Sequence, residues 1–174
     1  MTQRCLYVGD KLSSELILQL TATDGGVVQV TRLPTALTDP MSTSLQLELG
    51  SVEGQSRLLD WLRQNDPPTR ILCELQAFEF VTSDAGDTRS ASDYLSAQIV
   101  GITRILEAAL SLNPELRWVF LKPPVVDVWS DASEAYFRVL VEGLRTAAPS
   151  ARFDFLSMEQ SSSGRTNSRS TVVP

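Results

Sequence analysis

The chain has 174 residues, of which 43% are hydrophobic and 21% are charged, a composition typical of soluble globular proteins. Its net charge is −6 and it has no cluster of lysines and arginines, which argues against nucleic-acid binding. No apolar run is long enough to cross a membrane and no signal-peptide pattern is present, so we expect a cytoplasmic protein. The chain lacks histidine, which excludes Ser-His and Cys-His nucleophile pairs and histidine metal sites, and we predict no metal site.

The first half of the chain alternates between two patterns. Short apolar runs that end at glycine, proline or polar residues are typical of buried strands, and leucines at helical spacing are typical of amphipathic helices. These patterns predict strands at residues 4 to 8, 27 to 31 and 45 to 49, and helices at residues 12 to 21 and 51 to 65.

The second half continues the alternation. It predicts strands at residues 70 to 75, 116 to 121 and 151 to 158, and helices at residues 92 to 112 and 132 to 147. This order is typical of an α/β protein, and we predict a single Rossmann-like domain with a mostly parallel sheet of about six strands and helices on both faces. We place this domain at residues 1 to 159. Residues 160 to 174 contain no acidic residue, and we interpret them as a flexible polar tail or as a tail that becomes ordered against an acidic partner or a neighbouring subunit.

The loop after the first predicted strand is the first place to look for a ligand, because open parallel sheets bind ligands at the carboxyl ends of their strands. A phosphate-binding loop needs two or three glycines, but only Gly9 is present, and Asp10 and Glu15 add charges that oppose phosphate. Lys11 could still hold an anion. Arg32, after the second strand, could favour the phosphate of NADP or could be an ordinary surface residue.

Lys122 ends the fifth predicted strand and is followed by two prolines. A desolvated lysine at a strand end can act as a base or form a Schiff base, so Lys122 is a candidate catalytic residue. A lysine that is simply solvated is the alternative interpretation.

Two segments of the second half resemble a known family. Residues 94 to 129 place Gln98, Val100 and Gly101 at the start of a helix, followed by RILEAAL and a strand. This segment resembles the central helix and fifth strand of short-chain dehydrogenases, particularly of the epimerase-like branch. Residues 133 to 159 are similar to the end of the non-catalytic structural half of polyketide-synthase ketoreductases.

The chain departs from the pattern of this family at three places. The glycines of the cofactor loop are missing, and the position of the catalytic serine falls near Pro123 or Pro124. If Tyr136 matches the catalytic tyrosine, Leu140 stands where the family has a lysine. These losses predict a pseudo-enzyme without catalytic residues or a cofactor.

Such a pseudo-enzyme would act as a structural or partner-binding subunit, for example in a polyketide-type assembly or another large complex. The resemblance implies that two long helices meet their counterparts from another subunit. We therefore expect a protein partner or self-association through residues 92 to 112 and 132 to 147, and burial of these helices within their own domain is the alternative.

Two alternatives remain open. The first is a divergent NADP-dependent reductase or epimerase with Tyr136 and Lys122 as catalytic residues and with Gly9, Lys11 and Arg32 holding the cofactor. This alternative requires Tyr136 and Lys122 to face one pocket near Gly9. The second is a small-molecule sensor that uses the cleft of the Rossmann fold for an uncharged or cationic ligand.

Overall fold

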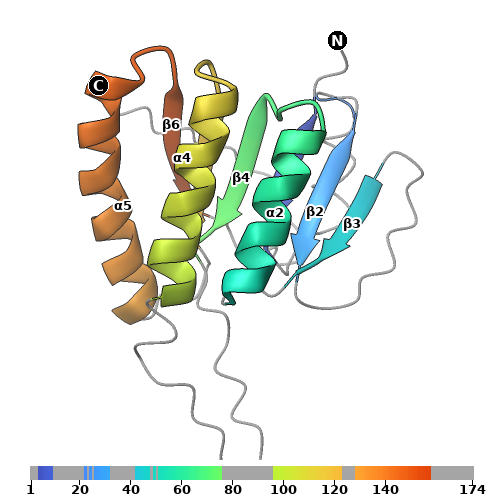
Figure 1. The fold of residues 1–174 in the computed structure, drawn as a ribbon. Helices are drawn as coiled ribbons and strands as arrows, with labels where there is room; N and C mark the ends of the chain where they lie inside the picture. The colour runs from blue at the N-terminus through green and yellow to red at the C-terminus, as the bar shows by residue number, and fades with distance from the viewer. Residues whose placement is uncertain are drawn as a thin grey trace, which may run out of the picture.

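The computed structural model describes residues 4–9, 22, 24, 26–31, 42–47, 49, 51–75, 96–122 and 128–157. Within this part of the chain the core is a six-stranded parallel sheet with the order β3-β2-β1-β4-β5-β6 (Figure 1). The strands are β1 (Cys5–Val8), β2 (Val27–Thr31), β3 (Ser42–Gln46), β4 (Arg70–Glu74), β5 (Arg117–Lys122) and β6 (Arg152–Ser157). The predicted α/β fold with a parallel sheet of about six strands is confirmed.

The third strand lies three residues earlier than the sequence pattern predicts. The alternating leucines favour a strand at residues 45 to 49, but β3 pairs with β2 from Ser42 to Gln46. Leu47 and Leu49 follow the strand and are buried in the main core. Because β3 lies at one end of the strand order, it pairs with a single neighbouring strand, and four of its five residues are polar.

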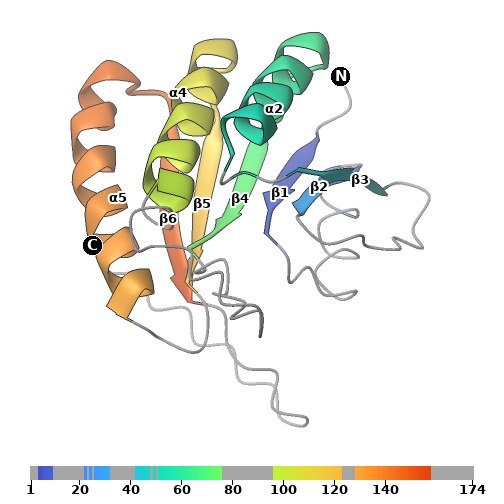
Figure 2. The same ribbon diagram turned by 60° about the horizontal axis from the view of Figure 1, so that its bottom comes forward.

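The helices of the described part are α2 (Val52–Gln64), the π-helical turn η1 (Ser96–Gly101), α4 (Ile102–Leu112) and α5 (Val128–Ala147). Figures 1 and 2 show α2, α4 and α5 side by side over one face of the sheet. This arrangement follows from right-handed crossovers, because the connections from β3 to β4, β4 to β5 and β5 to β6 all run in the same direction along the sheet. The helix predicted at residues 12 to 21 and the tail at residues 160 to 174 lie outside the described residues.

Helix α2 has the boundaries that its local signals predict. The Ser51 side chain accepts a hydrogen bond from the Gly54 backbone N–H at 3.0 Å, and the Asn65 backbone N–H donates to Trp61 O. Both caps depend on residues three or four positions apart, so they can be recognised from the sequence. Leu58 is buried on the face that packs against the sheet.

Gly101 lies at the junction between η1 and α4, where the chain packs tightly. A Cβ at this position would lie 3.0 Å from Gln55 Nε2 and 3.2 Å from Leu49 O. Gln55 is buried, and its Nε2 donates to Leu49 O at 2.9 Å while its Oε1 accepts from Arg104 at 3.1 Å. A glycine at this position therefore lets α4 approach α2 closely.

Stacked aromatic rings hold α5 against the sheet. The ring of Phe120 in β5 lies 5.0 Å from Phe137 in α5 and 4.7 Å from Phe155 in β6, measured between centroids. Helix α5 begins at Val128, four residues before the predicted start at Ala132. None of the helices in the described part is long and apolar enough to span a membrane.

Candidate functional site

The strand order reverses at β1, which pairs in parallel with β2 on one side and with β4 on the other. In an open parallel sheet, ligands bind at the carboxyl ends of the strands beside such a reversal. Figure 2 turns this edge of the sheet toward the viewer. Gly9 follows β1 at this edge and Glu74 ends β4, so these two residues define the candidate site.

The side chain of Glu74 packs directly against Gly9. A Cβ at residue 9 would lie 2.4 Å from Glu74 Cδ and 2.6 Å from Glu74 Oε2, so a side chain at this position requires Glu74 to move. Glu74 is only 6% exposed and accepts a hydrogen bond from the phenol of Tyr7, which is fully buried. Gly9 is therefore needed to make room for a buried carboxylate.

Gln29 completes the group of polar side chains at this edge. It is the register partner of Tyr7 on the neighbouring strand, and its Nε2 donates to Gly9 O at 3.1 Å. Its Oε1 is buried and has no hydrogen-bond partner among the described residues. A buried acceptor without a partner is costly, so this atom can accept a hydrogen bond from a ligand or water.

Sequence reasoning missed Tyr7, Gln29 and Glu74 as members of the site. All three lie within strands whose pattern is that of apolar, buried segments, and the only signal is a polar or charged residue among apolar neighbours. Tyr7 and Glu74 are 67 residues apart in the chain. Only the pairing of β1 with β4 brings them together.

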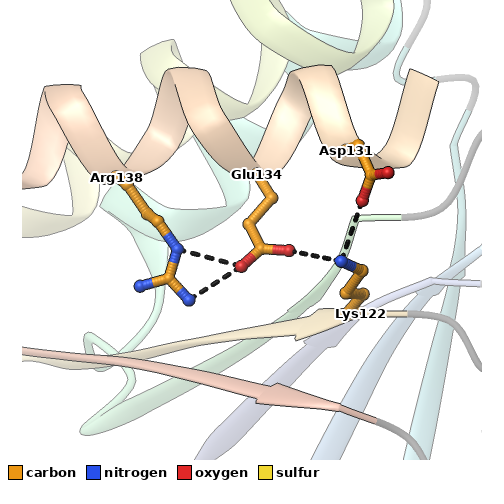
Figure 3. Close-up of polar contacts among 4 residues, drawn as sticks. All are labelled: Lys122, Asp131, Glu134 and Arg138. Carbon is orange, nitrogen blue, oxygen red and sulfur yellow. Dashed lines mark hydrogen bonds and ion pairs between the residues drawn. The ribbon is translucent and has the colours of Figure 1, made fainter. Parts of the chain in front are cut away.

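Lys122 lies at the end of β5 and is held by two carboxylates (Figure 3). Its Nζ lies 2.9 Å from Asp131 Oδ1 and 2.8 Å from Glu134 Oε2, and Glu134 also pairs with Arg138 at 2.7 Å. The hydrogen bonds to Glu134 and Asp131 raise the pKa of Lys122 above its ordinary value of 10.5, so the amine is protonated at neutral pH. The hydrogen bond from Lys122 lowers the pKa of Glu134.

This ion-pair network joins β5 to the start of α5 and extends to β6. Arg138, which pairs with Glu134, also lies over the ring of Phe155 with 4.2 Å between the guanidinium carbon and the ring centroid. The geometry assigns Lys122 a structural ion-pairing role. Its predicted role as a base, which needs a neutral amine, is not tested by the structure and stays a prediction.

Tyr136 points away from this network. It lies two residues from both Glu134 and Arg138 on α5, and two residues correspond to about 200° around a helix. Its hydroxyl instead lies 3.5 Å from the Thr103 hydroxyl on α4. The reductase alternative requires Tyr136 and Lys122 to face one pocket, but the structure places them on different sides of α5.

Several predicted positions lie outside the described residues, namely Lys11, Arg32, Pro123 and Pro124. Leu140, four residues after Tyr136, is partly buried and packs against the main core. No group of three or more Cys, Asp or Glu residues in the described part could hold a metal ion.

Cys5 and Cys73 are free and buried, as expected from their positions within apolar strands. Burial raises the pKa of the Cys5 thiol to about 12 and also raises that of Cys73. The neutral thiol form therefore dominates at physiological pH, and neither residue has the character of a reactive nucleophile.

Comparisons with known proteins point to one fold. No protein-family model matches the sequence. No curated protein matches it either. Among solved structures, a short-chain dehydrogenase from Leptospira borgpetersenii with bound NAD+ superposes with a TM-score of 0.67 at 12% identity, over 90% of this chain and 70% of the other. A short-chain dehydrogenase from Streptomyces avermitilis gives 0.62 at 19% identity, over 91% and 65%.

Uronate dehydrogenase from Agrobacterium tumefaciens in complex with NAD gives a TM-score of 0.58 at 15% identity, over 83% of this chain and 56% of the other. At these identities the likeness establishes the fold: the chain has the Rossmann-type fold of short-chain dehydrogenases.

One sequence-based prediction is wrong in the light of these comparisons. The sequence pattern predicts that the chain takes no cofactor, with NADP as the alternative. The Leptospira and Agrobacterium proteins share the fold of this chain, and they hold NAD+ and NAD. The missing glycines of the loop after β1 therefore do not justify the prediction of no cofactor.

Proposed function

We propose that this chain binds a nicotinamide dinucleotide at the carboxyl ends of β1 and β4. The observation that carries the proposal is the reversal of strand order beside Gly9 in a sheet that superposes on an NAD+-bound short-chain dehydrogenase over 90% of the chain. Lys11 and Arg32 are the candidate contacts to cofactor phosphates, and Arg32 would favour NADP over NAD.

Calorimetric titration of the purified chain with NADH and with NADPH at low salt tests this proposal. We expect a dissociation constant in the micromolar range for at least one of the two cofactors. No heat at millimolar concentration of either cofactor would overturn the proposal. The variant Arg32→Ala is the specificity control, since it should weaken NADPH binding and leave NADH binding unchanged.

We further propose that the chain binds the cofactor as a non-catalytic subunit. Two arrangements support this proposal: Leu140 packs against the core at the position where the family resemblance implies a lysine, and the amine of Lys122 is bound by two carboxylates. Proton transfer would be assisted by a neutral amine at Lys122 or by a lysine in place of Leu140, four residues after Tyr136. Neither is present.

The second candidate is a reductase, and the names of the structural neighbours favour it, since they are dehydrogenases. NADH and NADPH oxidation measured with a panel of aldehydes and ketones separates the two candidates. Turnover that is lost in Tyr136→Phe would support the reductase and contradict the non-catalytic role. Cofactor binding without turnover would support the non-catalytic role.

We propose that a second copy of the chain packs on the outer side of α4 and α5. Val139 is 75% exposed and Tyr136 is also exposed on the same side of α5, and a Cβ added to Gly143, one turn further on, would meet no atom of the described residues within 4 Å. Glycine in a helix interior is unfavourable, and its open surroundings leave room for a close helix contact. The neighbouring carboxylate of Glu142 is paired with Arg145, so its charge is compensated within α5.

A further inference from the structure

We propose that the outer edge of β6 binds an extended acidic segment of a partner protein, which adds to the sheet as a further strand. This segment carries an acidic side chain opposite Arg152 and an apolar side chain opposite Leu156. The edge is separated from β1 by β4 and β5, so the inference does not depend on the proposed cofactor site.

The backbone of β6 offers hydrogen-bonding groups to a further strand. Within the described part of the chain β6 is the last strand of the sheet and pairs with β5 alone. The Arg152 N–H donates to Leu116 O at 3.0 Å, so it points toward the start of β5. Because successive residues of a strand direct their backbone groups to alternate sides, those of Phe153, Phe155 and Ser157 point away from β5. Such a row of donors and acceptors is a template for strand pairing.

The two ends of the sheet differ in how they discourage pairing. At the opposite end, β3 has polar side chains at four of its five residues. The last three residues of β6 are Phe155, Leu156 and Ser157, which carry no charge, and Leu156 is 51% exposed. Proteins commonly protect edge strands with charged residues or prolines, and this half of β6 has neither. It therefore has the character of an edge that pairs.

The two faces of β6 have different surroundings. Phe155 lies under Arg138 of α5, with 4.2 Å between the guanidinium carbon and the ring centroid. Figures 1 and 2 show α5 over this face of the sheet. Side chains alternate along a strand, so Arg152, Asp154 and Leu156 lie on the other face. From its start to its end, that face of β6 presents a cation, an anion and an apolar side chain.

One carboxylate lies beside two arginines on this face. Arg117 and Arg152 are register partners on β5 and β6, and like charges directly opposite each other are unfavourable. Asp154 pairs with Arg117 at 2.8 Å. Arg152 is exposed and has no acidic partner among the residues that the structure describes. An acidic side chain of the bound segment supplies the missing charge.

Two other occupants fit this pattern less well. Residues 160–174 contain no acidic residue, so this part of the chain offers Arg152 no carboxylate. An antiparallel second copy would place its own Asp154 opposite Arg152 only in a register that pairs residues 152 to 154 and leaves Leu156 uncovered. A segment with its own acidic residue can meet both Arg152 and Leu156.

Two fluorescently labelled peptides test the inference by fluorescence polarisation with the purified chain. They are Thr-Glu-Thr-Val-Thr-Val-Thr and its reverse, Thr-Val-Thr-Val-Thr-Glu-Thr. In a parallel and an antiparallel added strand, respectively, they place glutamate opposite Arg152 and valine opposite Leu156. We expect at least one to bind with a dissociation constant of about 10 to 100 μM. No binding of either at about 1 mM protein would overturn the inference.

A charge exchange tests the role of Arg152. Arg152→Glu should weaken binding about tenfold, and lysine in place of the glutamate of the peptide should restore binding to this variant. Arg57→Glu is the matched control, because it makes the same change in charge at an exposed residue of α2 and should keep the affinity within about twofold. Equal weakening by the two variants would contradict a specific contact with Arg152.

The variant Ser157→Pro tests whether the peptide adds as a strand. It removes an N–H that points away from β5 and should weaken binding about fivefold without lowering the melting temperature. Unchanged affinity would mean that the peptide binds by charge alone, and the added strand would be wrong. If neither peptide binds and Ser157→Pro lowers self-association in sedimentation equilibrium, the edge pairs with a second copy and the inference is wrong.

Discussion

Lys122 Nζ lies 2.8 Å from Glu134 Oε2, so the carboxyl end of β5 is tied to the second turn of α5. Glu134 is less exposed than Asp131, the other carboxylate on Lys122, and also pairs with Arg138. Lys122 and Arg138 therefore both pair with the carboxylate of Glu134, and removal of this carboxylate should break both ion pairs.

The variant Glu134→Gln should lower the melting temperature by about 2 to 4 °C at pH 7, because it breaks two ion pairs at a partly buried position. Thermal unfolding followed by circular dichroism measures this change. Glu142→Gln breaks one exposed pair with Arg145 and should change the melting temperature by less than about 1 °C. A change of less than about 1 °C for Glu134→Gln as well would show that the network around Lys122 adds no stability.

The stabilisation by this network should depend on pH in two ways. The pKa of Glu134 is lowered, so its contribution is present above its ordinary pKa of 4.5 and is lost as the pH falls through its folded value. The pKa of Lys122 is raised, so its contribution is present below 10.5 and is lost as the pH rises through its folded value.

Urea unfolding of the unmodified chain and of Glu134→Gln between about pH 3 and pH 11 checks this expectation. The difference in unfolding free energy should be constant between about pH 5 and pH 10 and should shrink at both extremes. A difference that changes across neutral pH would mean that another group controls it.

The substitutions Gly9→Ala and Gly143→Ala should change the free energy of unfolding in opposite directions. Gly9→Ala forces a Cβ to within 2.4 Å of Glu74 and should destabilise the fold by about 1 to 3 kcal/mol. Gly143→Ala adds a Cβ in open space within α5 and should stabilise the fold by about 0.5 to 1 kcal/mol. Chemical unfolding measures both, and a neutral Gly9→Ala would mean that the buried position of Glu74 is not required.

Self-association should depend on Val139. Val139→Glu places a charge on the proposed contact between copies and should weaken dimerisation at least about tenfold, measured by sedimentation equilibrium. Val52→Glu is the matched control, because Val52 is 70% exposed at the start of α2, outside the proposed contact. A monomeric unmodified chain, or equal effects of the two variants, would contradict the proposed contact.

The sequence by itself determined the fold class and most element positions. The apolar runs of β1, β2, β4 and β5 and the caps of α2 at Ser51 and Asn65 depend on residues within a few positions of one another. Such local signals can be recognised in the sequence without knowledge of the fold. The predicted position of the third strand is wrong because an edge strand needs little apolar pattern. Leu47 and Leu49, which contributed to that pattern, follow the strand and are buried in the main core.

Only the tertiary structure decided the composition of the candidate site. Tyr7 meets Glu74 across 67 residues, and Lys122 meets Glu134 only because α5 returns over the end of β5. Helical geometry then turns Tyr136 to the side opposite Lys122. These contacts depend on strand order and on helix rotation, which no periodicity in the chain encodes.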